Sequence, residues 1–276
     1  MKQIIELYNS YLVKFPKLRQ EKFVTILAEG LGDYRGKPNG LATKLHPLGR
    51  MGAALGIFKN GELIFLTKNA STLPDIPMDP LGRFNSGSKT PTVCVGIYSL
   101  FTKLHGSKRI KAFELERGGE SVPVIRNSKD YIEYKSISSG INLHNRSVND
   151  SDRWAWSTGC QTVEKEDFDK IVNILGCYKN GRYVEGVYVG KIIIDRSRIP
   201  EVLQKRYQQR YGKYYLDCFN TEDVSTWARD AWDKFSVNGV NDGKGAKNIV
   251  TEEQLMVFLD RMEQYLVKKY NLEKLL

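Results

Sequence analysis

The stretch AALGIFKNGELIFLTK, residues 53–68, decides the fold class expected for this chain. Apolar residues dominate on both sides of Asn60-Gly61, the dipeptide most favoured in two-residue turns between antiparallel strands. The pattern therefore predicts a β-hairpin. Further short strands are expected over residues 92–101, 109–116, 121–126, 130–137, 140–145 and 185–195. Because no regular helical crossovers separate these strands, they favour a sandwich or a barrel-like sheet over a doubly wound fold.

Helices are expected before the strands. In the first helix, apolar residues recur at helical spacing until a proline interrupts them. The spacing of Phe23, Ile26 and Leu27 then predicts a second helical stretch that ends at Gly30. Residues 31–50 are rich in glycine, lysine and proline and are expected to form a loop or linker.

Helical periodicity returns later in the chain. One helix is expected over residues 164–175 and others over 198–210, 221–236 and 251–271. The resulting division has an N-terminal helical segment with its linker, a β-rich domain and a C-terminal helical module. These parts cover residues 1–45, 46–200 and 215–276, respectively.

The composition excludes several classes of protein. With 276 residues, of which 41% are hydrophobic, the chain is expected to be globular. It has no run of about 18 apolar residues, so no membrane span is expected, and its first residues lack the pattern of a secretory signal. The net charge of +10 favours anionic partners such as nucleic acid, membrane headgroups or wall polymers. Because there is no long Lys/Arg run and no nucleic-acid motif, nucleic acid is the less favoured partner.

Four cysteines stand at positions 94, 160, 177 and 218, without a CxxC pair and without the spacing of a metal site. We therefore expect neither a metal nor another cofactor. Cys94 lies in an alternating apolar pattern and is expected to be a buried strand residue. Cys160 differs, because polar and turn-forming residues surround it.

The segment GINLHNRSVNDSDRWAWSTGCQTV, residues 140–163, places a histidine before that cysteine. His144 ends an apolar half-strand, and Cys160 follows sixteen positions later in a Ser-Thr-Gly-Cys turn. Acyl transfer by a thiol needs a base within hydrogen-bond reach and donors for the oxyanion. Gly159 allows a sharp turn with converging N–H groups, and an ion pair with His144 would lower the pKa of the thiol. From spacing alone, a catalytic pair and an incidental pair are equal alternatives.

The same segment resembles the signature of the L,D-transpeptidase (YkuD-like) family of peptidoglycan cysteine enzymes: a strand ending in histidine, a spacer, and Ser/Thr-x-Gly-Cys. The resemblance implies that His144 is the general base and Cys160 the nucleophile. It also implies that Ser157 and Gly159 form the turn that carries the nucleophile. The likeness covers residues 50–195 and implies a β-rich sandwich core within an α+β chain.

A divergent branch of the family, found in phage and prophage lysis-type proteins, is similar in more detail. Its likeness includes the Trp-Ser-x-Gly-Cys-Gln ending and the upstream segments VGIYSLFTKLHGSKRIKAFELE and VPVIRNSKDY. Some positions depart from the family pattern. Thr158 stands where histidine is frequent, so the turn lacks a second imidazole, and Gln161 follows the nucleophile where an arginine is frequent nearby. Nucleophile and base are intact, while hydrolysis and transpeptidation both stay open.

Five residues are candidates for substrate binding: Arg146, Trp156, Thr158, Gln161 and His105. A guanidinium can hold a substrate carboxylate bidentately, and an indole can line a groove for sugar or peptide. Each has a plain alternative. Arg146 is equally well explained as a solvated loop charge, Trp156 as a residue packed beneath the loop, and His105 is favoured as an ordinary histidine at a strand end.

The segment WARDAWDKFSVNGVNDGKGAKNIVTEEQLMVFLDRM, residues 227–262, resembles a single S-layer-homology repeat, a type that anchors proteins to wall polymers. A calcium-binding loop is excluded, because Val240 and Ile249 fall on positions that need oxygen ligands. Glu252 replaces an arginine that is usual in such repeats. The alternative is a helical domain that packs on the core without binding a polymer.

The sequence thus predicts a lysin-like, peptidoglycan-active cysteine enzyme that acts on stem peptides by hydrolysis or L,D-transpeptidation. Its partners would be peptidoglycan and an anionic wall polymer, with no nucleic acid and no membrane span. It would be made in the cytoplasm without a signal peptide and reach the bacterial wall by release or another export route. The rival is a catalytically inactive wall-binding or phage-structural module. A papain-type or NlpC/P60-type peptidase is disfavoured, because in those classes the cysteine precedes the histidine.

Overall fold

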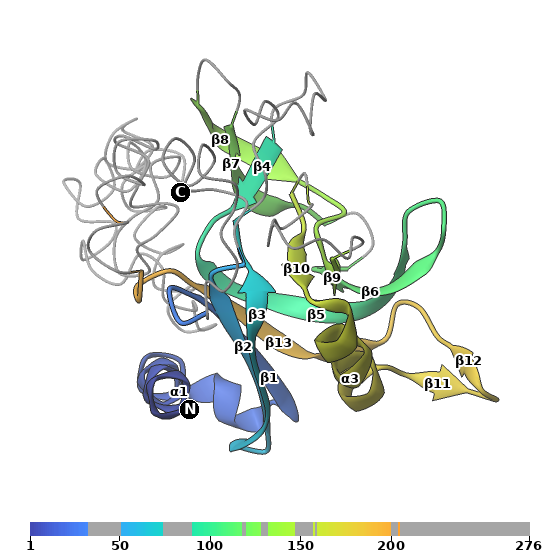
Figure 1. Cartoon of the computed structure of the whole chain (residues 1–276), viewed down its shortest axis with the longest axis horizontal. Helices are drawn as coiled ribbons and strands as arrows, with labels where there is room; N and C mark the ends of the chain where they lie inside the picture. The colour runs from blue at the N-terminus through green and yellow to red at the C-terminus, as the bar shows by residue number, and fades with distance from the viewer. Residues whose placement is uncertain are drawn as a thin grey trace, which may run out of the picture.

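The computed structural model describes residues 1–32, 51–73, 90–117, 120–127, 132–146, 157, 159–199 and 204 (Figure 1). Within these residues the expected β-rich fold with few helices is confirmed. The C-terminal module and its expected helices lie outside the described residues, as does most of the helix expected over 198–210. No helix in the described part is long and apolar enough to cross a membrane.

Eight of the described strands form one closed barrel. Their order around it is β1 (Phe23–Glu29), β13 (Tyr188–Asp195), β5 (Gly96–His105), β6 (Ile110–Leu115), β9 (Asn142–Asn145), β10 (Gln161–Val163), β3 (Glu62–Ser71) and β2 (Ala53–Lys59). The β1/β13 and β9/β10 pairs are parallel, and the other pairs are antiparallel. The barrel replaces the sandwich implied by the family resemblance, because β1 pairs with β13 on one side and β2 on the other and so joins the ends of the sheet.

The prediction of a helix that ends at Gly30 is wrong, because Phe23–Glu29 form the strand β1. This strand is covered on both faces, by α1 (Lys2–Lys14) outside the barrel and by the core inside it. Val24 and Ile26 belong to the cluster under α1, while Leu27 belongs to the core. A strand buried on both faces has apolar residues at most positions, so its short apolar run fits a helix equally well.

The first helix is confirmed as α1, which packs on the outside of the barrel. The Tyr8 ring stacks on Phe58 of β2 with ring centroids 3.9 Å apart. The Tyr11 hydroxyl donates to Oδ2 of Asp195, the last residue of β13, at 2.9 Å. A 3-10 turn over Pro16–Gln20 then leads into β1.

The expected hairpin is confirmed as β2 and β3. Lys59 pairs with Glu62, and between them Asn60 and Gly61 have φ values of 50° and 89°. Two successive positive φ values are those of the type I′ turn, whose twist matches that of paired strands. The Asn60-Gly61 dipeptide thus correctly predicted both the turn and its position.

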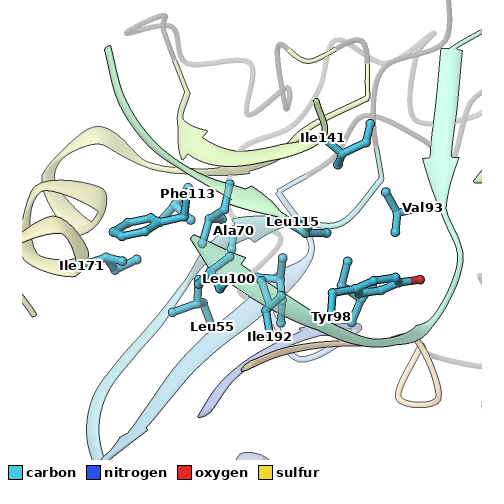
Figure 2. Packing of buried hydrophobic residues seen from close by; sticks show 14 of the residues in the cluster. Leu55, Ala70, Val93, Tyr98, Leu100, Phe113, Leu115, Ile141, Ile171 and Ile192 are labelled. Carbon is cyan, nitrogen blue, oxygen red and sulfur yellow. The ribbon is translucent and has the colours of Figure 1, made fainter. Parts of the chain in front are cut away.

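The barrel interior holds the main hydrophobic core. Figure 2 shows side chains from several strands meeting there, among them Leu55, Leu100, Phe113 and Ile192. The expected helix over 164–175 is confirmed as α3 (Lys165–Leu175), whose Phe168 packs edge-on to Phe113 with centroids 5.9 Å apart. Burying each large apolar side chain stabilises the fold by about 1.5–3 kcal/mol.

Polar contacts attach α3 to β3. The carboxylate of Asp167 accepts hydrogen bonds from Thr67 Oγ1, from Asn69 Nδ2 at 3.2 Å and from Lys170 Nζ at 3.1 Å. Burial alone would raise the pKa of Asp167, but these donors outweigh it and the pKa is lowered. After α3 the chain forms a short hairpin of β11 (Tyr178–Lys179) and β12 (Arg182–Tyr183).

A second sheet accompanies the barrel (Figure 1). It consists of three antiparallel strands, β4 (Thr90–Val93), β7 (Val122–Asn127) and β8 (Ile132–Ser138). The strand expected over 92–101 is therefore divided between β4 and β5, and Cys94 is buried at the junction. The buried Arg196 donates to the carbonyl oxygens of Val93 and Thr72, each at 2.7 Å. These bonds fix β4 at the end of the barrel.

Candidate active site

The barrel strands β9 and β10 position the candidate base and nucleophile next to each other. His144 of β9 pairs with Thr162 of β10, and Cys160 immediately precedes β10. Side chains alternate along a strand, and Leu143 belongs to the core. Asn142 and His144 on either side of it therefore face away from the core, toward the turn that carries Cys160.

His105, His144 and Cys160 form one cluster. One ring nitrogen of each histidine and Sγ of the cysteine lie within 4.8 Å of one another. The two imidazole rings are stacked, with centroids 4.9 Å apart and planes inclined by 16°. The structure thus brings the two predicted catalytic residues together. It also supplies a second imidazole from the end of β5, in place of the one that the nucleophile turn lacks.

A backbone carbonyl orients His144. Its Nδ1 lies 2.7 Å from the carbonyl oxygen of Asn145, so Nδ1 carries the proton and donates it. Nε2 is then the nitrogen able to accept a proton. Burial, together with the neighbouring His105, lowers the pKa of His144 to about 4, although the bond to the Asn145 carbonyl acts in the opposite direction. The imidazole is therefore neutral near pH 7.

Asn142 is a site residue that the sequence reasoning missed. Its backbone N–H donates to Sγ of Cys160 at 3.4 Å, and its side-chain Nδ2 lies 3.9 Å from the same sulfur. The same Nδ2 donates to the carbonyl oxygen of Gly140 at 2.6 Å and lies 3.0 Å from Nδ1 of His105. Asn142 thus links the nucleophile to the second imidazole. Strand alternation could have identified it, because residues 142 and 144 share a face.

The thiol of Cys160 is partly buried, and burial raises its pKa, although the two donors of Asn142 act in the opposite direction. The thiolate–imidazolium ion pair expected from the sequence is therefore corrected to a neutral pair. Its physical reason is desolvation, which disfavours the charged form of both Cys160 and His144. Such a pair can still react if the imidazole takes the thiol proton as sulfur attacks.

The nucleophile turn is closed by Ser157. The buried Ser157 hydroxyl donates to the carbonyl oxygen of Cys160 at 2.8 Å and accepts the N–H of Gly159 at 3.2 Å. Gly159 has a φ of +154°, and an added Cβ would lie 2.8 Å from Cγ of Pro91 on β4. Glycine is thus required by the backbone conformation and by the close approach of β4. The Gly159 N–H is used within the turn, so it does not point at a substrate.

The remaining candidates for substrate binding are buried or lie outside the described residues. Arg146 is not a solvated charge: it is 3% exposed, and its guanidinium lies 3.2 Å from the carboxylate of Glu164. Gln161 is fully buried and pairs with Leu143, which puts its side chain on the core side of the sheet. Trp156 and Thr158 lie outside the described residues. The substrate roles of all these residues stay predictions.

A cavity of about 380 Å³ lies between β6 and α3. It is lined by Ile110, Lys111, Asn145, Phe168, Asp169, Val172 and Asn173. Ile110 pairs with His105, and Asn145 directly follows His144. These residues are close to the two histidines in the strands, but neither imidazole lines the cavity, whose lining combines apolar surface with one cationic and one anionic side chain.

Comparisons with known protein families, with curated proteins and with solved structures found no significant match to this chain. Its chemistry is therefore argued from the residues and their geometry. A thiol beside a neutral imidazole suits acyl transfer. Within the described residues, the cluster of Cys160, His105 and His144 also offers one thiol and two imidazoles that can hold a metal ion.

Proposed function

We propose that the chain is a peptidoglycan-active cysteine enzyme that cleaves or exchanges stem peptides through an acyl-enzyme. Nε2 of His144 takes the proton of the Cys160 thiol while the sulfur attacks a peptide carbonyl carbon. The C–N bond then breaks, the amine leaves with the proton held by His144, and a thioester remains on Cys160. Water or a second amine attacks the thioester and restores the thiol.

The observation that carries this proposal is the pairing of Cys160 with a histidine that is held in the tautomer of a base. The Asn145 carbonyl accepts the Nδ1 proton of His144 at 2.7 Å, and a ring nitrogen of that histidine lies within 4.8 Å of Sγ. Catalytic hydrogen bonds are often long in the absence of substrate and shorten when substrate binds.

The substrate class is proposed from the family resemblance and is supported by charge. Peptidoglycan and its attached polymers are anionic, and the chain carries a net charge of +10. The cavity beside Asn145 holds Lys111 on one element and Asp169 on another. A peptide stem carries both free carboxylates and amines, so it can pair with both signs of charge.

A second candidate is a wall-binding module whose thiol is unreactive. Two observations favour it: burial raises the pKa of the Cys160 thiol, and the N–H of Gly159 donates to Ser157 rather than standing free for an oxyanion. Under this alternative the protein would bind walls tightly and release nothing.

Incubation with sacculi from several Gram-positive walls, followed by mass spectrometry of the soluble muropeptides, separates the two candidates. The proposal expects new muropeptides or exchanged crosslinks from the wild type and from Cys177→Ala, a variant of a thiol outside the cluster. It expects none from Cys160→Ala. Sedimentation with the sacculi, unaccompanied by any new muropeptide from the wild type, would support the wall-binding module instead.

A further inference from the structure

We infer that Cys160, His105 and His144 form a binding site for a divalent transition-metal ion of the zinc class, and that the bound ion masks the nucleophile. A thiolate with two imidazoles is a ligand set that Zn²⁺ and its neighbours prefer over Mg²⁺ or Ca²⁺, which take oxygen ligands. The three residues come from β5, from β9 and from the turn before β10. Sequence spacing therefore gives no sign of the site.

The distances suit such an ion after an adjustment in which the stacked His105 ring also turns, because the lone pairs of an imidazole lie in the plane of its ring. The three ligand atoms lie within 4.8 Å of one another. Zinc bonds of about 2.0–2.3 Å in a tetrahedral site place ligand atoms about 3.4–3.8 Å apart, so the cluster must close by about 1 Å. His105, at the partly buried end of β5, and Cys160, on a turn, can make this movement by side-chain rotation.

Hydrogen bonds around the cluster already orient the imidazoles. Nδ1–H of His144 donates to the Asn145 carbonyl, which leaves Nε2 available as a ligand. The Nδ2 amino group of Asn142 donates to Nδ1 of His105 at 3.0 Å, which places the ring proton of His105 on Nε2. Coordination through Nε2 therefore requires the Asn142 amide to turn its unpartnered Oδ1 toward the Nδ1–H of His105. In known sites, a hydrogen bond of the kind that His144 makes, from the second ring N–H to a backbone carbonyl, fixes the ligand tautomer. Three protein ligands leave a fourth position, which water can fill.

The charges near the cluster are compatible with a cation. Burial lowers the pKa of His105, and the positive charge of the nearby Lys103 lowers it further. Its ammonium group, however, lies 3.4 Å from the buried carboxylate of Glu114, which offsets its charge. When the metal binds, Cys160 releases its proton to solvent and forms the metal–sulfur bond, so the site gains one net positive charge rather than two.

The metal site and the proposed catalytic pair share the sulfur of Cys160 and a ring nitrogen of His144, so a bound ion would mask the nucleophile. This part of the inference rests on the proposed function. The sulfur of Cys160 would be bound to the metal and unable to attack a carbonyl, and His144 would have no free nitrogen to take a proton. The ion would therefore act as a reversible inhibitor, which a chelator removes. Metal binding itself does not depend on the protein being an enzyme.

Calorimetric titration of the metal-free full chain with Zn²⁺, and absorption spectroscopy with Co²⁺, test the binding. We expect one equivalent of either ion and a thiolate-to-cobalt band. Cys160→Ala should abolish the band, and His105→Ala should weaken binding at least about tenfold. Cys177→Ala, the control, should bind as the wild type does. Thermal unfolding of each variant without metal shows whether it is folded.

Absence of the band in the wild type, or equal Zn²⁺ affinity in the wild type, Cys160→Ala and His105→Ala, would overturn the proposed site. Muropeptide release measured with and without one equivalent of Zn²⁺ tests the masking separately. Release that Zn²⁺ leaves unchanged would overturn the masking. Specific Zn²⁺ binding by a protein that releases no muropeptides after chelation would sustain the metal site and refute the enzymatic function.

Discussion

Replacing Gly159 by alanine tests whether the nucleophile turn depends on its glycine. A side chain at φ +154° costs about 1–3 kcal/mol of backbone strain. The added Cβ would also lie 2.8 Å from Cγ of Pro91, an overlap that costs about 1–3 kcal/mol more. We expect Gly159→Ala to lower the free energy of unfolding by about 2–6 kcal/mol. Because the strain also displaces Cys160, kcat/KM on wall peptides should fall about 100-fold.

Urea unfolding and rate measurements on matched variants separate the effect of backbone strain from that of the overlap with Pro91. Gly181→Ala is the control, because Gly181 has φ +73° in the β11/β12 hairpin and nothing lies within 4 Å of its added Cβ. It should lose only about 1–2 kcal/mol and no activity. Adding Pro91→Ala to Gly159→Ala should recover the overlap cost but not the strain. Equal destabilisation by Gly159→Ala and Gly181→Ala, with full activity in both, would refute the reasoning.

Two further substitutions test other contacts. Asn142→Ala removes the amide that links His105 to Cys160, and kcat should fall about tenfold; turnover equal to that of the wild type would remove Asn142 from the site. Asp167→Asn tests the attachment of α3. Since the pKa of Asp167 is lowered in the fold, its carboxylate stabilises the protein above the ordinary pKa of 3.8, and this contribution disappears as the pH falls through the folded value. Urea unfolding should show the wild type about 1 kcal/mol more stable than Asp167→Asn at pH 7 and a smaller difference at pH 3; a pH-independent difference would contradict this account.

The parts of the fold that were predictable from the sequence have local signals. The Asn60-Gly61 turn fixed the β2/β3 hairpin, and one apolar face identified α3. β1 was misassigned because α1 and the core bury both of its faces. Closure of the barrel could not be predicted, since it depends on β1 pairing in parallel with β13, a strand about 165 residues later in the chain.

The candidate site divides in the same way. His144 and Cys160 came from a local motif, and the structure places them together. His105 could not be assigned from the sequence, because its contact with His144 requires the order β5–β6–β9 in the sheet. The neutral state of the Cys160/His144 pair was also beyond sequence reasoning, since it results from burial by segments distant in the chain.

Trapping the acyl-enzyme tests most directly whether Cys160 is the nucleophile. The wild type, Cys160→Ala and Cys177→Ala would be mixed with a purified stem peptide, quenched in acid, and measured by intact-protein mass spectrometry and peptide mapping. We predict an added acyl group on the peptide that contains Cys160 in the wild type and in Cys177→Ala, removable by hydroxylamine, and none in Cys160→Ala. Undiminished turnover by Cys160→Ala, with no adduct on the wild type, would contradict the proposed mechanism.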